Sequence, residues 1–392
     1  MAGVIDIDKV RADTPACGTL LHFNNAGASL MPEPVRQAVQ HHLDREAAIG
    51  GYEAEAEAAE DITAFYTEMA AMIGASADEI AFVENATRAW DMAFYGLPLT
   101  EGDRILTHRS EYVSNYLALL QQATRRGLAV DLVPSDDTGQ IDIAALEAMI
   151  GPRTRLIALT HVPTHGGLIN PAEEVGVVAR RHNLIYMLDA CQSSGQMPLD
   201  VAAIGCDVLS GTGRKFLRGP RGTGFLYVSR RIIDRIEPPF IDLRAAQLTD
   251  DTSYRLAEGA RRFENWESFV AGRVGLAAAI RYARSIGIEA IAARVTYLAD
   301  MLRDALAETG AVTLRDTGVR KSGIVTFTKQ GEPAEAVVAR LRRQGINVSA
   351  SGVPSALLDF APRGLTSVVR ASVHYYNTEA EIARFCAALT AD

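Results

Sequence analysis

The middle of the chain alternates short apolar segments with stretches of helical character. Five apolar runs are predicted to form strands, at residues 104–107, 156–160, 184–189, 208–210 and 224–228, with a helical stretch at 171–182. Short apolar strands separated by helices indicate a parallel or mixed sheet that is covered on both faces. Ligands bind to such sheets outside the carboxyl ends of the strands, so the polar residues that end these strands are candidates for a site.

The pattern changes after about residue 264. The later elements are predicted as a helical region over 269–309, strands at 324–327, near 348 and at 368–373, and helices at 333–344 and 379–389. This order is typical of a small α+β domain. A chain of 392 residues is long enough for one large domain and a smaller one. We predict an N-terminal segment (1–20), a large domain (21–260) and a small C-terminal domain (261–392).

Charge and composition exclude several classes of partner. The net charge is −9, whereas proteins that bind nucleic acid usually carry a basic patch. No apolar run reaches the roughly 18 residues that span a bilayer, and the first residues lack a signal-peptide core. We therefore expect a cytoplasmic protein with no nucleic-acid or membrane partner. The four cysteines are far apart and show no CxxC spacing, so we expect neither a metal site nor a disulfide framework.

Lys215 is the first candidate for chemistry. It lies in a segment rich in glycine and hydroxyl groups, directly after Arg214. A lysine that acts as a Schiff-base nucleophile must be partly neutral, and both burial and a neighbouring cation lower its pKa. Arg214 and Thr212 are also suited to bind a phosphate. The alternative is a basic surface turn, because Arg218 and Arg221 follow closely.

Asp189 ends the apolar run 185–189. A carboxylate at this place can pair with the protonated nitrogen of a cofactor ring, and Gln192 can then form a hydrogen bond to the phenolic oxygen of that ring. The alternative is that Asp189 caps the next helix.

Two further segments are open to two interpretations each. Residues 82–90 are predicted to be a strand that turns into a helix, so the amides of Ala86 and Thr87 would face outward as a phosphate site. The alternative is simple capping of the helix by Asn85 or Thr87. Arg370 interrupts an apolar strand and needs an anion. That anion is either a substrate carboxylate, held bidentately, or the partner in a structural salt bridge.

Together these segments resemble the class V aminotransferase family, which has fold type I of the pyridoxal 5'-phosphate (PLP) enzymes. The match covers nearly the whole chain. The matching segments, with the family patterns they resemble, are 22–29 (LDNAAT), 85–87 (the phosphate turn), 111–115 (EHHAN), 161–164 (HVSN), 189–192 (DGAQ), 210–215 (SGHK), 219–228 (GPTGIGILY) and 370–378 (RASLAMYNT).

The resemblance implies an α/β fold of type I, with a mainly parallel seven-stranded sheet in the large domain and a smaller α+β C-terminal domain. It implies PLP as the cofactor, linked to the catalytic Lys215 as a Schiff base. The implied cofactor-binding residues are Ala86, Thr87, Tyr112, Thr164, Asp189, Gln192, Thr212, Arg214 and Asn265, and the implied substrate-binding residues are Asn25 and Arg370. A homodimer with a shared active site is also implied, because residues 262–264 match the family segment that reaches the partner's phosphate.

The departures from the family pattern affect the expected reaction. Tyr112 replaces a histidine that stacks on the pyridine ring, and Thr164 replaces an asparagine near the ring oxygen. Cysteine desulfurases carry a catalytic cysteine in the stretch that matches 345–369, and here that stretch contains none. A desulfurase accepts sulfur on an enzyme thiolate. Cys191, beside Asp189, is expected to be a small buried residue.

The resemblance implies an enzyme that acts on an α-amino acid through an external aldimine and a Cα carbanion. Residues 49–54 and 262–267 resemble a subgroup whose members cleave a Cβ–S bond without an active-site cysteine. We therefore expect a C–S lyase that acts by β-elimination. The alternatives are an aminotransferase, an amino-acid epimerase and, more remotely, a PLP-binding protein without catalytic activity.

Overall fold

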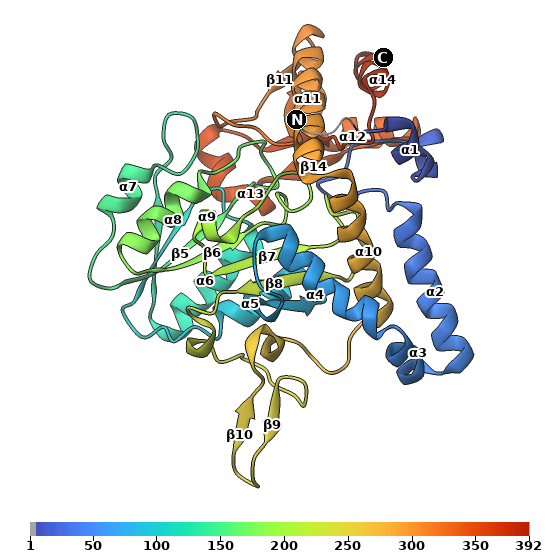
Figure 1. Ribbon diagram of the computed structural model, residues 1–392. Coiled ribbons are helices and arrows are strands. Elements are labelled where there is room, and N and C mark those ends of the chain that lie inside the picture. Colours follow the sequence, from blue (N-terminus) through green and yellow to red (C-terminus); the bar gives the residue numbers. More distant parts are fainter. Residues whose placement is uncertain (1–4, 392) are drawn as a thin grey trace.

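A seven-stranded sheet forms the centre of the larger part of the molecule (Figure 1). The computed structural model describes residues 5–391. In spatial order the strands are β2 (Ile80–Val83), β8 (Gly224–Val228), β7 (Val208–Thr212), β6 (Ile185–Asp189), β5 (Thr154–Thr160), β3 (Arg104–His108) and β4 (Ala129–Val133). Of these seven strands, β8 alone runs in the opposite direction to the other six, which confirms the predicted mainly parallel sheet.

Both faces of this sheet are covered because its central strands are apolar on both sides. One face packs Ile157 and Leu159 of β5 against the helices α4 (Ala59–Ile73), α7 (Ile143–Ala148), α8 (Ala172–Arg181) and α10 (Val270–Ile286). The other packs Leu156 and Ala158 against α5 (Ala86–Phe94) and α6 (Val113–Arg126). Successive residues of a strand point to opposite faces, so one continuous apolar run supplies both cores. The short helix α9 (Val201–Ile204) precedes β7.

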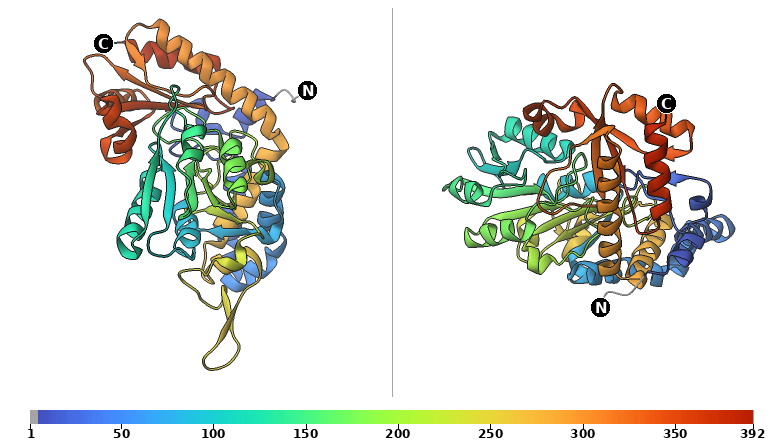
Figure 2. Two further views of the ribbon diagram at one scale, coloured as in Figure 1. Left: turned by 90° about the vertical axis from the view of Figure 1, so that its left-hand side faces the viewer. Right: turned by 90° about the horizontal axis from the view of Figure 1, so that it is seen from above.

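A second, antiparallel sheet forms the smaller part, orange to red in Figures 1 and 2. Its strands, in spatial order, are β11 (Val312–Leu314), β12 (Ile324–Lys329), β15 (Ser367–Ser372) and β14 (Ser349–Gly352). The helices α11 (Ile288–Glu308), α12 (Ala334–Arg343) and α14 (Glu379–Thr390) share one core with it. The helix α13 (Val353–Phe360) follows β14.

The predicted helical region over 269–309 is in fact two helices. α10 ends and α11 begins around Gly287, whose φ of 96° interrupts the helix. A left-handed backbone costs glycine little, and a single glycine was too weak a signal to predict the break. α10 packs against α2 (Glu33–Ile49) and α4, whereas α11 belongs to the core of the smaller sheet.

The N-terminal segment packs on the smaller part. Its elements are α1 (Ile7–Ala12), the 3-10 turn Pro15–Gly18 and β1 (Leu21–His22), which pairs in parallel with β13 (Ile346–Asn347). Val10, Cys17 and Phe23 lie in the same core as α11 and α14. The boundaries at residues 20 and 260 stay predictions.

A hairpin of β9 (Ala246–Leu248) and β10 (Tyr254–Leu256) projects from the larger part, on the side away from the smaller sheet (Figure 1). The helix α3 (Gly51–Glu57) follows α2 near the edge of the molecule. Within residues 5–391, no helix has the length and apolar character needed to cross a membrane.

Candidate active site at the carboxyl ends of the strands

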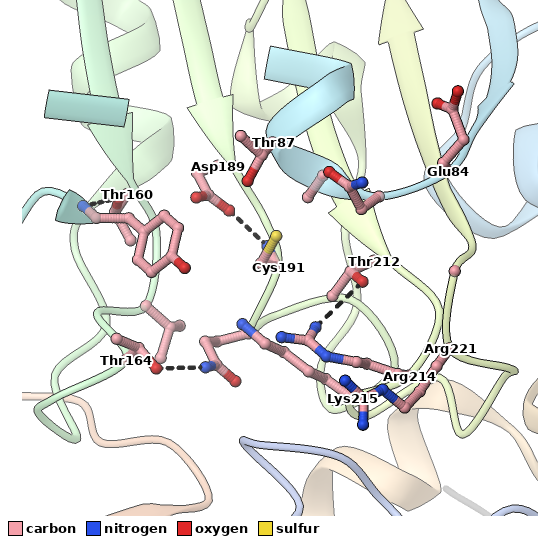
Figure 3. Close-up of a pocket in the computed structure, with 16 residues that line it drawn as sticks. Glu84, Thr87, Thr160, Thr164, Asp189, Cys191, Thr212, Arg214, Lys215 and Arg221 are labelled. Carbon is pink, nitrogen blue, oxygen red and sulfur yellow. Dashed lines mark hydrogen bonds between the residues drawn. The ribbon is translucent and has the colours of Figure 1, made fainter. Parts of the chain in front are cut away.

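A cavity of about 290 Å³ lies at the carboxyl ends of β5, β6 and β7 (Figure 3). Most of the predicted site residues line it: Ala86, Thr87, Tyr112, Thr164, Asp189, Gln192, Thr212, Arg214 and Lys215. These residues come from five separate segments of the sequence, and the sheet brings them together because parallel strands end at one edge.

Lys215 lies in a turn shortly after β7, and its side chain reaches the cavity (Figure 3). The amide of Arg218 donates to the carbonyl of Lys215 at 2.9 Å, and Arg218 itself has a φ of 59°. Lys215 is only 7% exposed. Burial lowers the pKa of its amine, and the charges of Arg214 and Arg370 lower it further against the opposing effect of Asp189. The turn therefore presents an amine that is readily neutral and can act as a nucleophile.

Asp189 and Gln192 stand at the end of β6. Asp189 accepts the Cys191 amide on Oδ1 at 2.8 Å and the Asn115 side chain on Oδ2 at 2.9 Å. Gln192 donates to Thr164 Oγ1 at 2.9 Å and to the carbonyl of Ala26 at 3.1 Å. Its Oε1 atom is buried and has no hydrogen-bond partner within residues 5–391. The end of β6 thus offers a fixed carboxylate and an unsatisfied amide oxygen to a polar ligand.

The start of α5 provides a place for an anion. Asn85 caps the helix by accepting the amide of Arg88 at 2.9 Å, and Ala86 and Thr87 form the first turn, at the wall of the cavity. The first amides of a helix have no partner within the helix, and the helix dipole adds partial positive charge there. Gly224 allows the close approach of β8, because a Cβ at that position would lie 3.0 Å from the Asn85 carbonyl carbon.

Two side chains after β7 add to this anion site. The Arg214 guanidinium donates to Thr212 Oγ1 at 3.3 Å, and both side chains line the cavity opposite the start of α5 (Figure 3). A guanidinium, a hydroxyl and helix amides together are suited to a phosphate group.

Arg370 reaches the site from β15 of the smaller sheet. Its Nη1 donates to the carbonyl and hydroxyl oxygens of Thr164 at 2.9 and 2.7 Å, and its Nη2 donates to Asn24 Oδ1 at 3.3 Å. Arg370 is 8% exposed, and burial, helped by Arg214, lowers its pKa to about 10. Among the described residues no carboxylate lies within 4.0 Å of it, so the structural salt bridge considered from the sequence is not seen. A buried cation without its own anion is suited to a carboxylate ligand.

Arg370, which contacts the lining residue Thr164, and two further predicted residues are not among those that line the cavity. Asn25 is buried, donates to the carbonyl of Ser372 at 2.7 Å and accepts the hydroxyl of Tyr376. Its neighbour Asn24, which the sequence did not single out, is the asparagine that contacts Arg370. Asn265 accepts from Arg88 at 3.4 Å, and its role toward a partner subunit stays a prediction.

A family model described as Aminotransferase class-V matches residues 21–385. The chain belongs to the class-V aminotransferase family. A probable cysteine desulfurase from Pyrococcus abyssi is 31% identical over 388 residues, which are 97% of this chain and 96% of the relative. The apo structure of a cysteine desulfurase from Thermococcus onnurineus NA1 is also 31% identical, has a TM-score of 0.91 and covers 99% of this chain and 98% of its own.

Two solved structures of C-DES are each 25% identical to this chain. One is a lysine-to-alanine variant with glycine covalently linked to its PLP cofactor, with a TM-score of 0.87 over 97% of this chain and 98% of its own. The other is the cystine C–S lyase C-DES in complex with its reaction product cysteine persulfide, with a TM-score of 0.86 over 96% of this chain and 98% of its own.

These relatives confirm that the chain is a PLP-dependent enzyme of fold type I. The cavity fits this cofactor in its chemistry, since it joins a buried amine, a fixed carboxylate and an anion site. The unpartnered buried atoms Gln192 Oε1 and Arg370 Nε, both within the described residues, also call for a polar ligand.

Proposed function

We propose that this member of the class-V aminotransferase family is a C–S lyase that releases sulfur directly into solution. The substrate would be an α-amino acid with sulfur on Cβ. The names of its relatives, cysteine desulfurase and cystine C–S lyase, support C–S cleavage. Release into solution is supported by the stretch 345–369, which has no cysteine and here forms β13, β14, α13 and the start of β15.

The state of Cys191 is the observation that carries this proposal. It is the one cysteine among the described residues that lines the cavity. Burial raises the pKa of its thiol well above the usual value, and the charge of Asp189 raises it further. A thiolate is the form that accepts sulfur as a persulfide. Cys191 is held as a thiol, so it is poorly suited to that step.

We assign the cofactor contacts as follows. Bound PLP supplies an electron-withdrawing ring that stabilises negative charge at the substrate's Cα. Asp189 would face the ring nitrogen and keep it protonated, and Tyr112 would cover one face of the ring. The phosphate would lie between the start of α5 and Arg214. Thr164 and Gln192, which are hydrogen-bonded to each other, would lie near the ring oxygen.

Lys215 and Arg370 would handle the substrate itself. Arg370 would bind the α-carboxylate through its unpartnered Nε and the neighbouring Nη2, which fixes the orientation of Cα. The neutral amine of Lys215 would take the α-proton, as its lowered pKa allows. The electron pair of the C–S bond then leaves with sulfur, and the remaining three-carbon fragment hydrolyses to pyruvate and ammonia. This sequence of steps needs no protein thiol.

We further propose a homodimer in which a second copy completes the site. Large apolar side chains are exposed over residues 240–269, among them Leu243 and Leu248 at 67% and 78% and Trp266 at 51%. Apolar surface gathered in this way marks an interface. Asn265 lies within the same stretch and contacts Arg88 in the first turn of α5. A fully active monomer in sedimentation and kinetic assays would contradict the shared site.

We expect a cytoplasmic location for this enzyme. The four cysteines, Cys17, Cys191, Cys206 and Cys386, are all free, as in proteins of a reducing compartment.

Product analysis tests the reaction. The holoenzyme is incubated with cysteine, cystine and S-conjugates of cysteine, without an added keto acid. The lyase releases pyruvate, ammonia and a sulfur product in equal amounts. Turnover that requires a keto acid would instead indicate an aminotransferase, and inversion at Cα an epimerase. If no amino acid changes the visible absorbance of the bound cofactor, the protein is not an enzyme of this kind.

A further inference from the structure

A buried carboxylate lies just behind the cavity wall. Glu111 precedes α6, is 4% exposed and does not line the cavity. The segment 111–115 resembles a family motif, yet neither Glu111 nor Asn115 has a role in the function proposed above. Their hydrogen bonds lead directly to residues assigned to the cofactor.

Asn115 connects two carboxylates. Its side-chain nitrogen donates to Glu111 Oε1 at 2.9 Å and to Asp189 Oδ2 at 2.9 Å. An amide nitrogen has two hydrogens, so both are used. Asp189 Oδ1 accepts the amide of Cys191 at 2.8 Å. The plane of the Asp189 carboxylate is therefore fixed by two donors, one of which is itself held by Glu111.

Glu111 also holds the Tyr112 segment. Its Oε1 accepts the amide of Tyr112 at 3.0 Å and the hydroxyl of Thr160, and its Oε2 accepts Thr107 Oγ1 at 3.2 Å. Tyr112 and Thr160 both line the cavity. One buried side chain thus connects the residue predicted to cover the ring with the residue predicted to pair with its nitrogen.

Burial raises the pKa of Glu111 to about 7, although the bonds from Thr160 and Asn115 act in the opposite direction. The arrangement suits a neutral side chain. Oε1 must accept, because the Tyr112 amide and the Asn115 nitrogen can only donate. Oε2 meets only a hydroxyl, Thr107 Oγ1, which can either donate or accept.

We propose that Glu111 and Asn115 are positioning residues that keep Asp189 and Tyr112 correctly oriented toward the cofactor. They do so through the geometry of their hydrogen bonds rather than through charge. The proposal rests on the assignment of Asp189 as the partner of the ring nitrogen.

Two pairs of variants separate geometry from charge. In Glu111→Gln, the amide oxygen can replace Oε1 and the NH₂ group can donate to Thr107, so every bond is kept while the possible charge is lost. Glu111→Ala removes the bonds. Asn115→Asp keeps the shape of the side chain but replaces the donating nitrogen by an oxygen. That oxygen cannot donate a hydrogen bond to the carboxylate oxygens of Glu111 and Asp189. Asp207→Asn is the control, because Asp207 is a buried carboxylate at the amino end of β7, away from the cavity. It accepts the amide of Tyr186 at 3.0 Å and the Nε of Arg231 at 2.7 Å.

The experiment titrates each apoprotein with PLP and records the dissociation constant, the absorbance maximum of the cofactor linked to Lys215 and the melting temperature of the apoprotein. We expect Glu111→Gln to bind PLP within about 3-fold of wild type with an unchanged spectrum. Glu111→Ala and Asn115→Asp should bind about 10- to 100-fold more weakly with a shifted maximum, because the Asn115 donor that orients the Asp189 carboxylate is no longer held in place or is lost. Asp207→Asn should lower the melting temperature and leave the spectrum unchanged.

Several results would overturn the proposal. One is equal impairment of Glu111→Gln and Glu111→Ala, which would assign the effect to charge. Another is a wild-type spectrum and affinity in Asn115→Asp, or in Glu111→Ala if Asn115→Asp does not fold. A third is a lower melting temperature of the Glu111 and Asn115 variants with unchanged PLP affinity and spectrum, which would show a purely structural role. If wild-type protein does not bind PLP at Lys215, the assignment of the cofactor site fails instead.

Discussion

Lys215, Arg214 and Arg370 bring three basic side chains close together at the carboxyl ends of the strands, and the positive charges of the two arginines lower the pKa of the lysine. Among the residues that line the cavity, Asp189 is the one buried carboxylate. An excess of buried positive charge is costly unless anions bind there. The phosphate of PLP and the carboxylate of an amino acid are two such anions, and each has its own arginine.

The link between Lys215 and the cofactor leads to the first prediction. Borohydride reduction of the holoenzyme should fix PLP to Lys215, which mass spectrometry of the digested protein can locate. Lys215→Ala should lower turnover by several orders of magnitude, because it removes both the nucleophile and the proton acceptor. A reduced adduct on another lysine would exclude the assignment.

Arg370 leads to the second prediction. Arg370→Lys keeps the charge but loses the planar fork, so kcat/KM should fall by about 10- to 1000-fold, while bound PLP and Tm change little. Arg303→Lys is the control. Arg303 is a buried arginine of α11 with a 2.8 Å ion pair to Asp316, so its replacement should lower Tm and spare kcat/KM. The reverse pattern in Arg370→Lys would show a structural role.

The sequence identified the residues that follow strands in local motifs, such as Lys215, Asp189 and Thr87, because their neighbours in the chain define the turn. It could not separate Asn24 from Asn25, because successive side chains point in different directions and only the packing decides which one faces Arg370. Asn115 connects Glu111 to Asp189, although Asn115 and Asp189 lie 74 residues apart in the sequence. This connection is visible only in three dimensions.

At the scale of elements, the sequence predicted the central strands because they are continuously apolar. It missed β4 and β11, which are edge strands with partly exposed residues and thus a weak apolar pattern. It also missed the exposed β9–β10 hairpin and α13. For these elements, tertiary contacts rather than local composition decide the conformation.

The junction of α10 and α11 leads to the third prediction. Gly287 has a φ of 96°, and a Cβ at this position would meet only Ala290 Cβ at 3.9 Å. Space is therefore available, and the cost of Gly287→Ala comes from the backbone alone, at about 1 kcal/mol of unfolding free energy or more. Denaturant unfolding measures it, with Gly51→Ala in α3 as the control, which should be neutral or slightly stabilising because nothing lies near that position. An equal response of the two variants would refute the backbone argument.

At the scale of the whole molecule, the site lies where the two sheets meet. β15 carries Arg370 to Thr164 of the larger part, and Arg218 after Lys215 donates to Thr14 of the N-terminal segment and to the Tyr375 hydroxyl. The lysine turn is thus anchored to elements of the smaller part. Substrate binding at Arg370 therefore depends on how the larger and the smaller part are placed relative to each other.

Buried histidines lead to the fourth prediction. Burial lowers the pKa of His108 to about 4 and that of His161 to about 4. The unfolded chain binds these protons near pH 6.5, so it holds more protons than the folded state between about pH 6.5 and about pH 4. The stability that the neutral histidines contribute, at most about 3 kcal/mol each, is present above this window and is lost as the pH falls through it.

Urea unfolding at about pH 7.5 and about pH 5 measures this loss. His161→Gln should reduce the pH dependence, whereas replacement of the exposed His182 should not. Stability that stays constant or rises on acidification would contradict the burial of neutral histidines.

Cleavage of a C–S bond without a protein thiol is the central claim, and Cys191→Ala tests it most directly, because Cys191 is the cysteine that lines the cavity in the described chain. The measurement is the rate at which the holoenzyme variant releases pyruvate from its best sulfur-containing amino acid. We predict a kcat/KM within about 3-fold of wild type, because the cysteine only packs beside Asp189. A fall of about 100-fold or more, with cofactor still bound, would show that the thiol takes part and would contradict the proposed mechanism.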